Sequence, residues 1–207
     1  YPEPGGRLDV LATMRGTQNL LFDLIDCPDN VQQALDALET LWWKFHAEFD
    51  DIIAPGNHGC YTIAMRLLSP APMECGTCDF SAMISPDMFG QFVMPFLRRQ
   101  AEHFDGRIVW HLDGPGELPH LNHLLPFEGV HAIQWVSGAG NPHGLDPVHD
   151  DLYRRILNAG KKIMTGGPAR PELVKALFER FPREAFCMNF TVKSRAEAES
   201  LMEAAGL

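Results

Sequence analysis

The stretch Arg107-Ile-Val-Trp-His-Leu-Asp-Gly-Pro-Gly116 decides the fold of this chain. It begins with an apolar run typical of a strand that is buried on both faces, and it ends in a turn rich in glycine. Patterns typical of helices lie before and after it. A buried strand between two helices predicts a parallel sheet whose neighbouring strands are connected by helical crossovers.

The same order of apolar run, turn and helix recurs along the chain. Residues that suit an N-cap or a first helical turn indicate where the helices begin: Pro28, Ser85 with Pro86, Pro147, Pro171, and Ser194 with Glu197. The predicted helix after Pro28 buries one stripe: Val31, Leu35, Leu38, Leu41 and Trp42. We expect six strand–helix units, with apolar runs at 8–13, 61–68, 107–113, 130–136, 162–165 and 185–190.

These units could build an open doubly wound sheet or a (β/α) barrel. A dinucleotide-binding sheet would carry Gly-x-Gly-x-x-Gly, and the nearest runs, at Gly114 and Gly138, lack the third glycine. Polar residues instead collect at the strand ends, as they do at a barrel mouth: Asp79, His111, Asp113, Gln134, Gly166 and Cys187. Eight strands need about 250 residues. We therefore expect residues 1–207 to form one domain, the C-terminal portion of a (β/α)8 TIM-type barrel that lacks its first strands.

The composition is that of an ordinary globular protein, with 45% hydrophobic and 21% charged residues. The net charge of -10 makes nucleic acid or an anionic membrane an unexpected partner, and no apolar run approaches the roughly 18 residues of a membrane helix. Five irregularly spaced cysteines form a poor disulfide framework, which favours the reducing cytoplasm. The chain opens at Tyr1 without an initiator methionine or a leader, and we expect it to be part of a longer chain.

His111-Leu-Asp113 is the strongest candidate site. Side chains at positions i and i+2 of a strand point to the same face, so the imidazole and the carboxylate converge on one point. At the end of a barrel strand, that point lies in the mouth where chemistry occurs. The two side chains could bind a divalent metal or act as an acid–base pair; the alternative is a histidine held in place by a neighbouring aspartate.

Two further side chains could complete this site. Cys187 lies near the end of the last predicted strand, which in a barrel lies across the mouth from His111. His111, Asp113 and Cys187 with an open fourth position would suit a catalytic zinc ion. Asp79, which precedes the helix start at Ser85, is a candidate for proton transfer or for metal binding.

The remaining candidates are less specific. Cys75-Gly-Thr-Cys78 has the spacing of a redox pair or of half a structural zinc site, but a second pair is absent, so we expect a loop. Gln134 and Trp135 end the 130–136 strand, where one of them must face inward, and both are predicted with Gly166 to contact substrate. His120 and His123 are expected to be exposed or capping residues on an outer helix.

The order of several segments resembles the uroporphyrinogen decarboxylase superfamily. The likeness covers nearly the whole chain and rests on Arg15-Gly-Thr-Gln-Asn-Leu-Leu-Phe-Asp23 before Cys27-Pro28, Ile84-Ser-Pro-Asp-Met-Phe89 with Phe92-Val-Met-Pro95, and His111-Leu-Asp-Gly114. The resemblance implies a (β/α)8 barrel with its active-site cleft at the carboxyl ends of the strands. It also implies an enzyme, either the haem-pathway decarboxylase or a zinc-dependent methyltransferase that moves methyl groups to or from corrinoid proteins.

The methyltransferase branch is the more similar of the two. The His111 strand resembles their zinc-binding His-x-Cys-Gly strand with Asp113 in place of the cysteine, and Cys187 matches their second cysteine in position. A carboxylate in place of a thiolate makes a harder zinc site. The arginine-rich segment and the key aspartate of the decarboxylase have no counterpart here, and the nearest candidates for binding substrate carboxylates are Arg66 and Arg170.

Three functions follow as hypotheses. The first is zinc-assisted methyl transfer between a small methylated substrate or a corrinoid protein and an acceptor, which zinc would activate by lowering its pKa. The second is cofactor-free decarboxylation of a tetrapyrrole polycarboxylate, with Asp79 or Asp113 moving the proton. The third is an inactive barrel fragment or an assembly piece, whose open sheet edges would form a homo-oligomer or pair with a companion chain. We expect the first.

Overall fold

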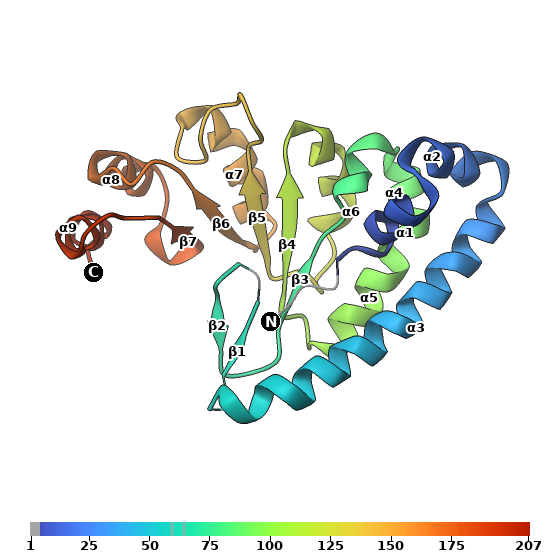
Figure 1. The fold of residues 1–207 in the computed structure, drawn as a ribbon. Helices are drawn as coiled ribbons and strands as arrows, with labels where there is room; N and C mark the ends of the chain where they lie inside the picture. Colours follow the sequence, from blue (N-terminus) through green and yellow to red (C-terminus); the bar gives the residue numbers. More distant parts are fainter. Residues whose placement is uncertain (1–4, 59, 64) are drawn as a thin grey trace.

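The computed structural model describes residues 5–58, 60–63 and 65–207. Its centre is a parallel five-stranded sheet in the order β3-β4-β5-β6-β7 (Figure 1). The strands are β3 (Glu74–Gly76), β4 (Ile108–Asp113), β5 (Ala132–Val136), β6 (Lys162–Gly166) and β7 (Phe186–Asn189). Their order in space follows their order in the chain, as in a barrel wall and unlike a doubly wound sheet, whose strand order reverses at a switch point. The chain is thus an α/β protein, and within the described residues the sheet does not close.

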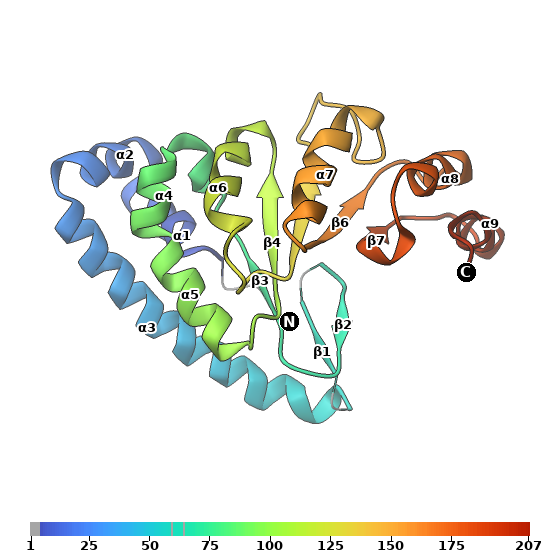
Figure 2. The same ribbon diagram turned by 180° about the vertical axis from the view of Figure 1, so that it is seen from behind.

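Helices cover one face of this sheet, as Figure 2 shows from behind. The α-helices are α1 (Arg7–Arg15), α2 (Thr17–Asp26), α3 (Pro28–Ile53), α4 (Pro86–Phe92), α5 (Met94–His103), α6 (Leu121–Leu124), α7 (Asp150–Asn158), α8 (Pro171–Arg180) and α9 (Arg195–Ala205). Short 3-10 turns join several of them: η1 (Ala54–Gly56), η2 (Asp79–Met83), η3 (Pro115–His120), η4 (Pro147–His149) and η5 (Arg183–Ala185).

The helix starts agree with the capping residues in the sequence. The Ser85 hydroxyl accepts a hydrogen bond from the Met88 amide, and the Ser194 hydroxyl accepts one from the Glu197 amide. Proline occupies the first turn of α3, α4 and α8. These local contacts satisfy amides that have no partner inside a helix, which is why these boundaries could be predicted.

Two of the six predicted strands are wrong. Residues 8–13 lie in α1, where Leu8 and Ala12 share a buried helical face. The run 61–68 instead contributes to an antiparallel pair outside the main sheet, in which β1 (Tyr61–Thr62) pairs with β2 (Leu68–Ser69). Arg66 adopts a left-handed conformation with φ 61, and this turn divides the apolar run into two short strands. The first strand of the sheet is instead β3, which has only three residues.

The buried face of the long helix α3 differs from the predicted one. Val31, Leu35 and Trp42 are buried, whereas Leu41 is 46% exposed and Leu38 is half-buried. The buried face also includes Glu39 and His46. Glu39 contacts the guanidinium groups of both Arg7 on α1 and Arg99 on α5, and this network ties three helices together.

The strand register assigns a role to each face of the sheet. Trp110, Leu112, Ile133, Trp135 and Ile163 belong to the main hydrophobic core, which includes residues of the helix layer. On the opposite face, Val109, Ala132 and Met164 pack against Ile63 and Met65 from the hairpin segment. His111, Gln134, Met164 and Cys187 pair in succession across β4 to β7, and so form one row on this second face.

Among the described residues, no helix combines the length and the apolar character that crossing a membrane requires.

Candidate functional site

The site is built at the carboxyl end of β4. His111 and Asp113 lie two residues apart on the strand, so both side chains leave the same face of the sheet. The strand ends at Gly114, whose φ of 83 is readily adopted only by glycine, and the Gly114 amide donates to the Val136 carbonyl of β5 at 2.8 Å. This turn places both side chains at the open end of the sheet.

Asp79 joins them from η2. Asp79, His111 and Asp113 each present one possible ligand atom, and these atoms all lie within 4.8 Å of one another. His111 Nε2 lies 3.9 Å from Asp79 Oδ1, and the Thr77 hydroxyl donates to the same oxygen at 3.3 Å. One imidazole nitrogen and two carboxylate oxygens at this separation form a donor set suitable for a divalent cation.

Gln134 fixes the orientation of the His111 ring. His111 Nδ1 lies 2.6 Å from Gln134 Oε1, which can only accept, so Nδ1 carries the hydrogen. Nε2 therefore has a free lone pair on the side of Asp79. Protein metal sites use the same arrangement, in which the second ring nitrogen of a ligating histidine donates to an oxygen.

Two more carboxyl groups surround this cluster. Asp9 on α1 accepts the Phe80 amide at 2.7 Å, and burial raises its pKa, assisted by Asp79. Glu117 on η3 is 1% exposed and accepts the Asp113 amide at 3.0 Å. Burial, together with the charges of Asp79 and Asp113, raises the pKa of Glu117 to about 8. Glu117 is therefore protonated at neutral pH, as expected for a carboxyl group buried beside other acidic side chains.

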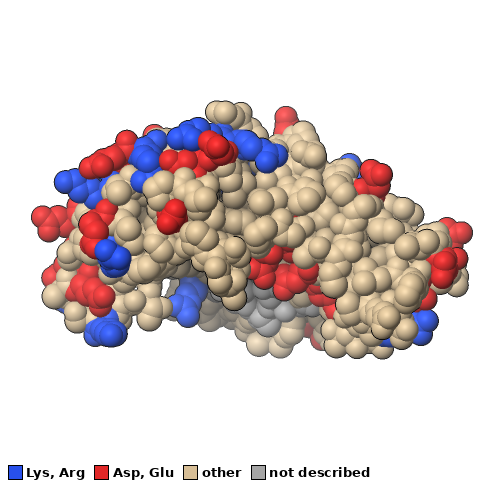
Figure 3. Space-filling model, turned by 90° about the horizontal axis from the view of Figure 1, so that it is seen from above, with Lys and Arg blue, Asp and Glu red and all other residues tan. Residues whose placement is uncertain are grey.

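A cleft of about 450 Å³ opens beside the cluster. Its lining includes Asp9, Asp79, His111 and Gln134, and its volume lies in the range typical of small-molecule sites. Figure 3 views this end of the molecule from above and shows acidic atoms gathered near the middle of the face. A second hollow of about 290 Å³ continues over the ends of β5 to β7, where Gly166 is part of the lining.

Cys187 does not share this site in the described structure. It lies on β7, three strands away from His111 along the same row, and it packs against the apolar cluster that contains Met164. Cys187 is also outside the group of ligand atoms around His111, where Asp79 takes the place predicted for it. Burial raises the pKa of the Cys187 thiol, which favours the thiol over the metal-binding thiolate.

Gln134 and Trp135 point to opposite faces of β5. Gln134 reaches His111, whereas Trp135 is 3% exposed and lies in the core beside His149. The Trp135 ring lies in the main core, although the residue also borders the second hollow, and its predicted contact with substrate stays a prediction. Gly166 ends β6 opposite Asn189, and its backbone borders the second hollow.

The other candidate residues lie in the packed interior of the protein or are partly buried. Cys78 is buried in the main core and Cys75 in the apolar cluster on the other face, so the two cysteines belong to different clusters. His120 is 1% exposed rather than on the surface: its Nε2 bonds the Ser81 carbonyl at 2.8 Å and its ring stacks on Phe89. His123 is half-buried near Gly90.

Sequence reasoning missed Asp9, Thr77 and Glu117. Asp9 lies in a segment predicted to be a strand, and Thr77 and Glu117 are polar residues in short turns that have no periodic pattern. The proline and glycine after Asp113 indicate a turn, but they do not reveal that Glu117 is buried.

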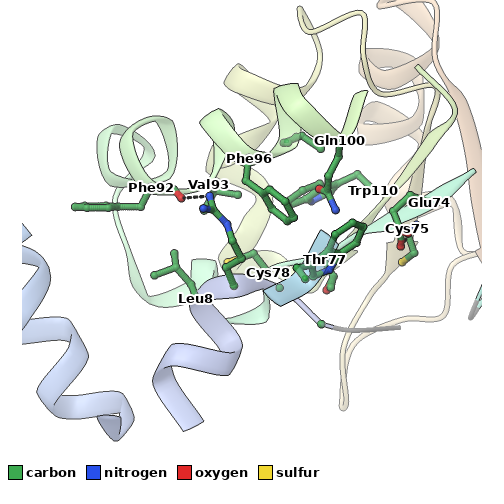
Figure 4. A pocket seen from close by; sticks show the side chains of 15 residues that line it. Leu8, Glu74, Cys75, Thr77, Cys78, Phe92, Val93, Phe96, Gln100 and Trp110 are labelled. Atoms are coloured by element: carbon green, nitrogen blue, oxygen red, sulfur yellow. Dashed lines mark hydrogen bonds between the residues drawn. The ribbon is translucent and has the colours of Figure 1, made fainter. Parts of the chain in front are cut away.

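A separate enclosed cavity lies between α1, β3 and α5 (Figure 4). Its volume is about 20 Å³, and Phe96, Gln100 and Trp110 are among the residues that line it. A space of this size holds about one water molecule, so it is not a substrate site.

The fold and the site together define an α/β protein with a His–Asp–Asp cluster at the carboxyl ends of parallel strands. No protein-family model and no curated protein sequence matches the chain. Among solved structures, a methyltransferase from Methanosarcina mazei aligns with 97% of this chain and 56% of its own length, with a TM-score of 0.62 and 13% identity. At this identity the likeness shows a shared fold alone, and the chain spans about half the length of that methyltransferase.

Proposed function

We propose that Asp79, His111 and Asp113 bind a divalent cation, with zinc as the expected ion, and that the whole protein uses it in methyl transfer. The observation that carries the proposal is the convergence of the three ligand atoms within 4.8 Å, together with the Gln134 contact that leaves His111 Nε2 free. Zinc bound by three protein ligands keeps a fourth position open for a reacting group.

The residues of this chain fit such an ion. When bound, zinc would lower the pKa of an acceptor thiol or hydroxyl and so make it a better nucleophile toward a methyl group. Asp79 and Asp113 supply the negative charge that offsets the ion, and Gln134 orients the imidazole. Two carboxylates and one imidazole form a harder set of ligands than one that contains thiolates. An ion held by such a set favours an acceptor whose reaction does not depend on a soft, thiolate-bound metal.

Two independent similarities support methyl transfer. One is the resemblance of the strand that ends in His111-Leu-Asp-Gly114 to the zinc-binding strand of corrinoid-linked methyltransferases. The other is the fold shared with the Methanosarcina mazei methyltransferase. A corrinoid-carrying protein or a small methylated compound would then supply or receive the methyl group.

The decarboxylase hypothesis has less support. A tetrapyrrole polycarboxylate calls for clustered arginines. Among the described residues that line the two hollows over the strand ends, there is no arginine or lysine. Arg170 forms an ion pair with Glu172, and Arg66 is exposed on the hairpin turn.

The decisive experiment measures metal content by elemental analysis in the purified protein and in four variants: Asp79→Ala, His111→Ala, Asp113→Ala and Cys187→Ala. We expect about one zinc per chain in the wild type, little or none in His111→Ala, and reduced amounts in the two aspartate variants. Cys187→Ala is the matched control and should keep its metal. Metal-free protein in every sample, after refolding with zinc and with native circular dichroism, would reject the proposal.

A further inference from the structure

The backbone amide of Asp113 lies beyond the end of the neighbouring strand. β3 pairs with β4 only as far as Gly76 opposite Trp110, whereas β5 continues alongside β4 to Asp113. The Gly114 amide points toward β5, where it bonds Val136. Successive amides of a strand point to opposite sides, so the Asp113 amide points toward the side of β3, which has already ended.

Glu117 supplies the acceptor that β3 does not. The turn at Gly114 leads into η3, and the Glu117 amide bonds the Gly114 carbonyl at 3.2 Å. This turn brings the Glu117 side chain back so that its Oε2 accepts the Asp113 amide at 3.0 Å. The side chain is 1% exposed, and its Oε1 has no hydrogen-bond partner in the described part of the chain.

The buried Asp113 amide needs an acceptor at this position, because an amide left without a hydrogen-bond partner away from water lowers stability. Glu117 is the residue that provides it, since β3 pairs with β4 only as far as Gly76. The same carboxyl group also determines where β4 ends, and hence where the Asp113 side chain leaves the strand.

We propose that Glu117 is a positioning residue of the cation site, which fixes the end of β4 so that Asp113 faces His111 and Asp79. This inference rests on the proposed cation function. Gln134 has the corresponding role for His111. Gln134 bonds the Nδ1 of His111 rather than its ligand atom Nε2, and Glu117 bonds the backbone amide of Asp113 rather than its carboxylate.

The test compares Glu117→Gln, which keeps an acceptor oxygen, with Glu117→Leu, which removes it at similar volume. Zinc affinity is measured by competition with a chromophoric chelator. We expect Glu117→Gln to stay within about threefold of the wild type and Glu117→Leu to bind about 10- to 100-fold more weakly, as is typical when an outer-shell partner of a metal ligand is lost. Glu74→Leu is a matched control, because Glu74 is also buried and bonds a strand amide, that of Cys75, at the other end of the sheet. It should lower stability without changing zinc affinity.

A second readout needs no metal. Hydrogen exchange of the Asp113 amide should be slow in the wild type and in Glu117→Gln and fast in Glu117→Leu. Fast exchange in the wild type would overturn the inference even if the leucine variant does not fold. Equal zinc affinity in a folded Glu117→Leu would also overturn it while leaving the cation proposal intact. A wild type that binds no zinc but shows slow exchange would reject the cation proposal and, with it, the role of Glu117 toward a cation.

Discussion

His111 presents its Nε2 lone pair toward Asp79 because Gln134 Oε1 accepts the hydrogen on Nδ1. We expect Gln134→Leu to weaken zinc binding about 10- to 100-fold, since the ring then loses both its tautomer preference and its fixed orientation. Gln134→Glu keeps an acceptor at the same place and should bind zinc at least as tightly as the wild type. Isothermal titration with zinc checks both expectations: Gln134→Leu with the affinity of the wild type would contradict the first, and Gln134→Glu with weaker binding than the wild type would contradict the second.

Glu117 should give the metal-free protein a distinctive dependence of stability on pH. Its pKa in the folded state is about 8, above the ordinary value of 4.5, so the folded protein binds more protons than the unfolded chain between these pH values. The stabilisation from this proton is complete below about pH 4.5 and is lost as the pH rises through about 8. Each unit of the raised pKa corresponds to about 1.4 kcal/mol.

Urea denaturation between pH 5 and pH 8.5, with a chelator present, measures this effect. Glu117→Gln should flatten the decline in the free energy of unfolding over that range. A wild-type slope that the glutamine variant retains in full would assign the decline to other groups.

The sequence predicts which side chains lie close together only where their positions within one strand or helix determine it. His111 and Asp113 share a strand, and their common face follows from the two-residue repeat. The prediction that Cys187 joins the site assumes a closed barrel, but the distance between Cys187 and His111 depends on how the intervening strands curve, which no local pattern encodes. Trp135 and Gln134 show the same limit: the sequence indicates that one faces inward, and only the register with β4 decides which.

At the scale of elements, the contacts of Glu39 hold α1, α3 and α5 together. Arg7 is 5% exposed and bonds both Glu39 and the Leu35 carbonyl. Glu39→Leu should destabilise the protein by about 3–5 kcal/mol, because it leaves the Arg7 charge buried without a counterion. The double variant Arg7→Met/Glu39→Leu should recover much of this loss, because neither charge then remains. Thermal and urea denaturation of the three proteins measure the difference, and a double variant less stable than Glu39→Leu would contradict the expectation.

Helices with capping residues were predicted well, and short strands were not. Four of the five strands in the sheet coincide with predicted runs, with β6 ending one residue later than predicted, because each has several consecutive apolar residues bounded by turns. β3 has only three residues, and its place depends on pairing with β4 rather than on its own composition. Residues 8–13 are apolar enough for a strand, but burial of Leu8 and Ala12 on one face favours a helix.

At the scale of the whole molecule, no described strand pairs with β7 on the side away from β6. An apolar groove of about 460 Å³ lies beside it, between β7, α8 and α9, and exposed Met202 is part of its lining. Edge strands next to apolar surface promote association. We expect light scattering after size-exclusion chromatography to give a mass that rises above that of one chain as concentration increases.

Met202→Lys should shift this equilibrium toward single chains by adding a charge to the groove. Met14→Lys is the matched control, since Met14 is also exposed but lies on α1, away from β7. A wild type with the mass of one chain at every concentration would show that the open edge does not associate by itself.

The hairpin next to the sheet has a consequence for how the protein is made. The Asn189 side chain on β7 donates to the Met65 carbonyl at 2.8 Å, so one contact joins residues that are 124 positions apart. Contacts this distant in the chain form late, because a long loop must first be closed. During synthesis on the ribosome, the segment around Met65 emerges well before Asn189 does. Until Asn189 emerges, the segment that contains Ile63 and Met65 lacks its contacts with β7. Nascent chains stalled before β7 should therefore be cut by proteases at 60–69 more readily than released chains.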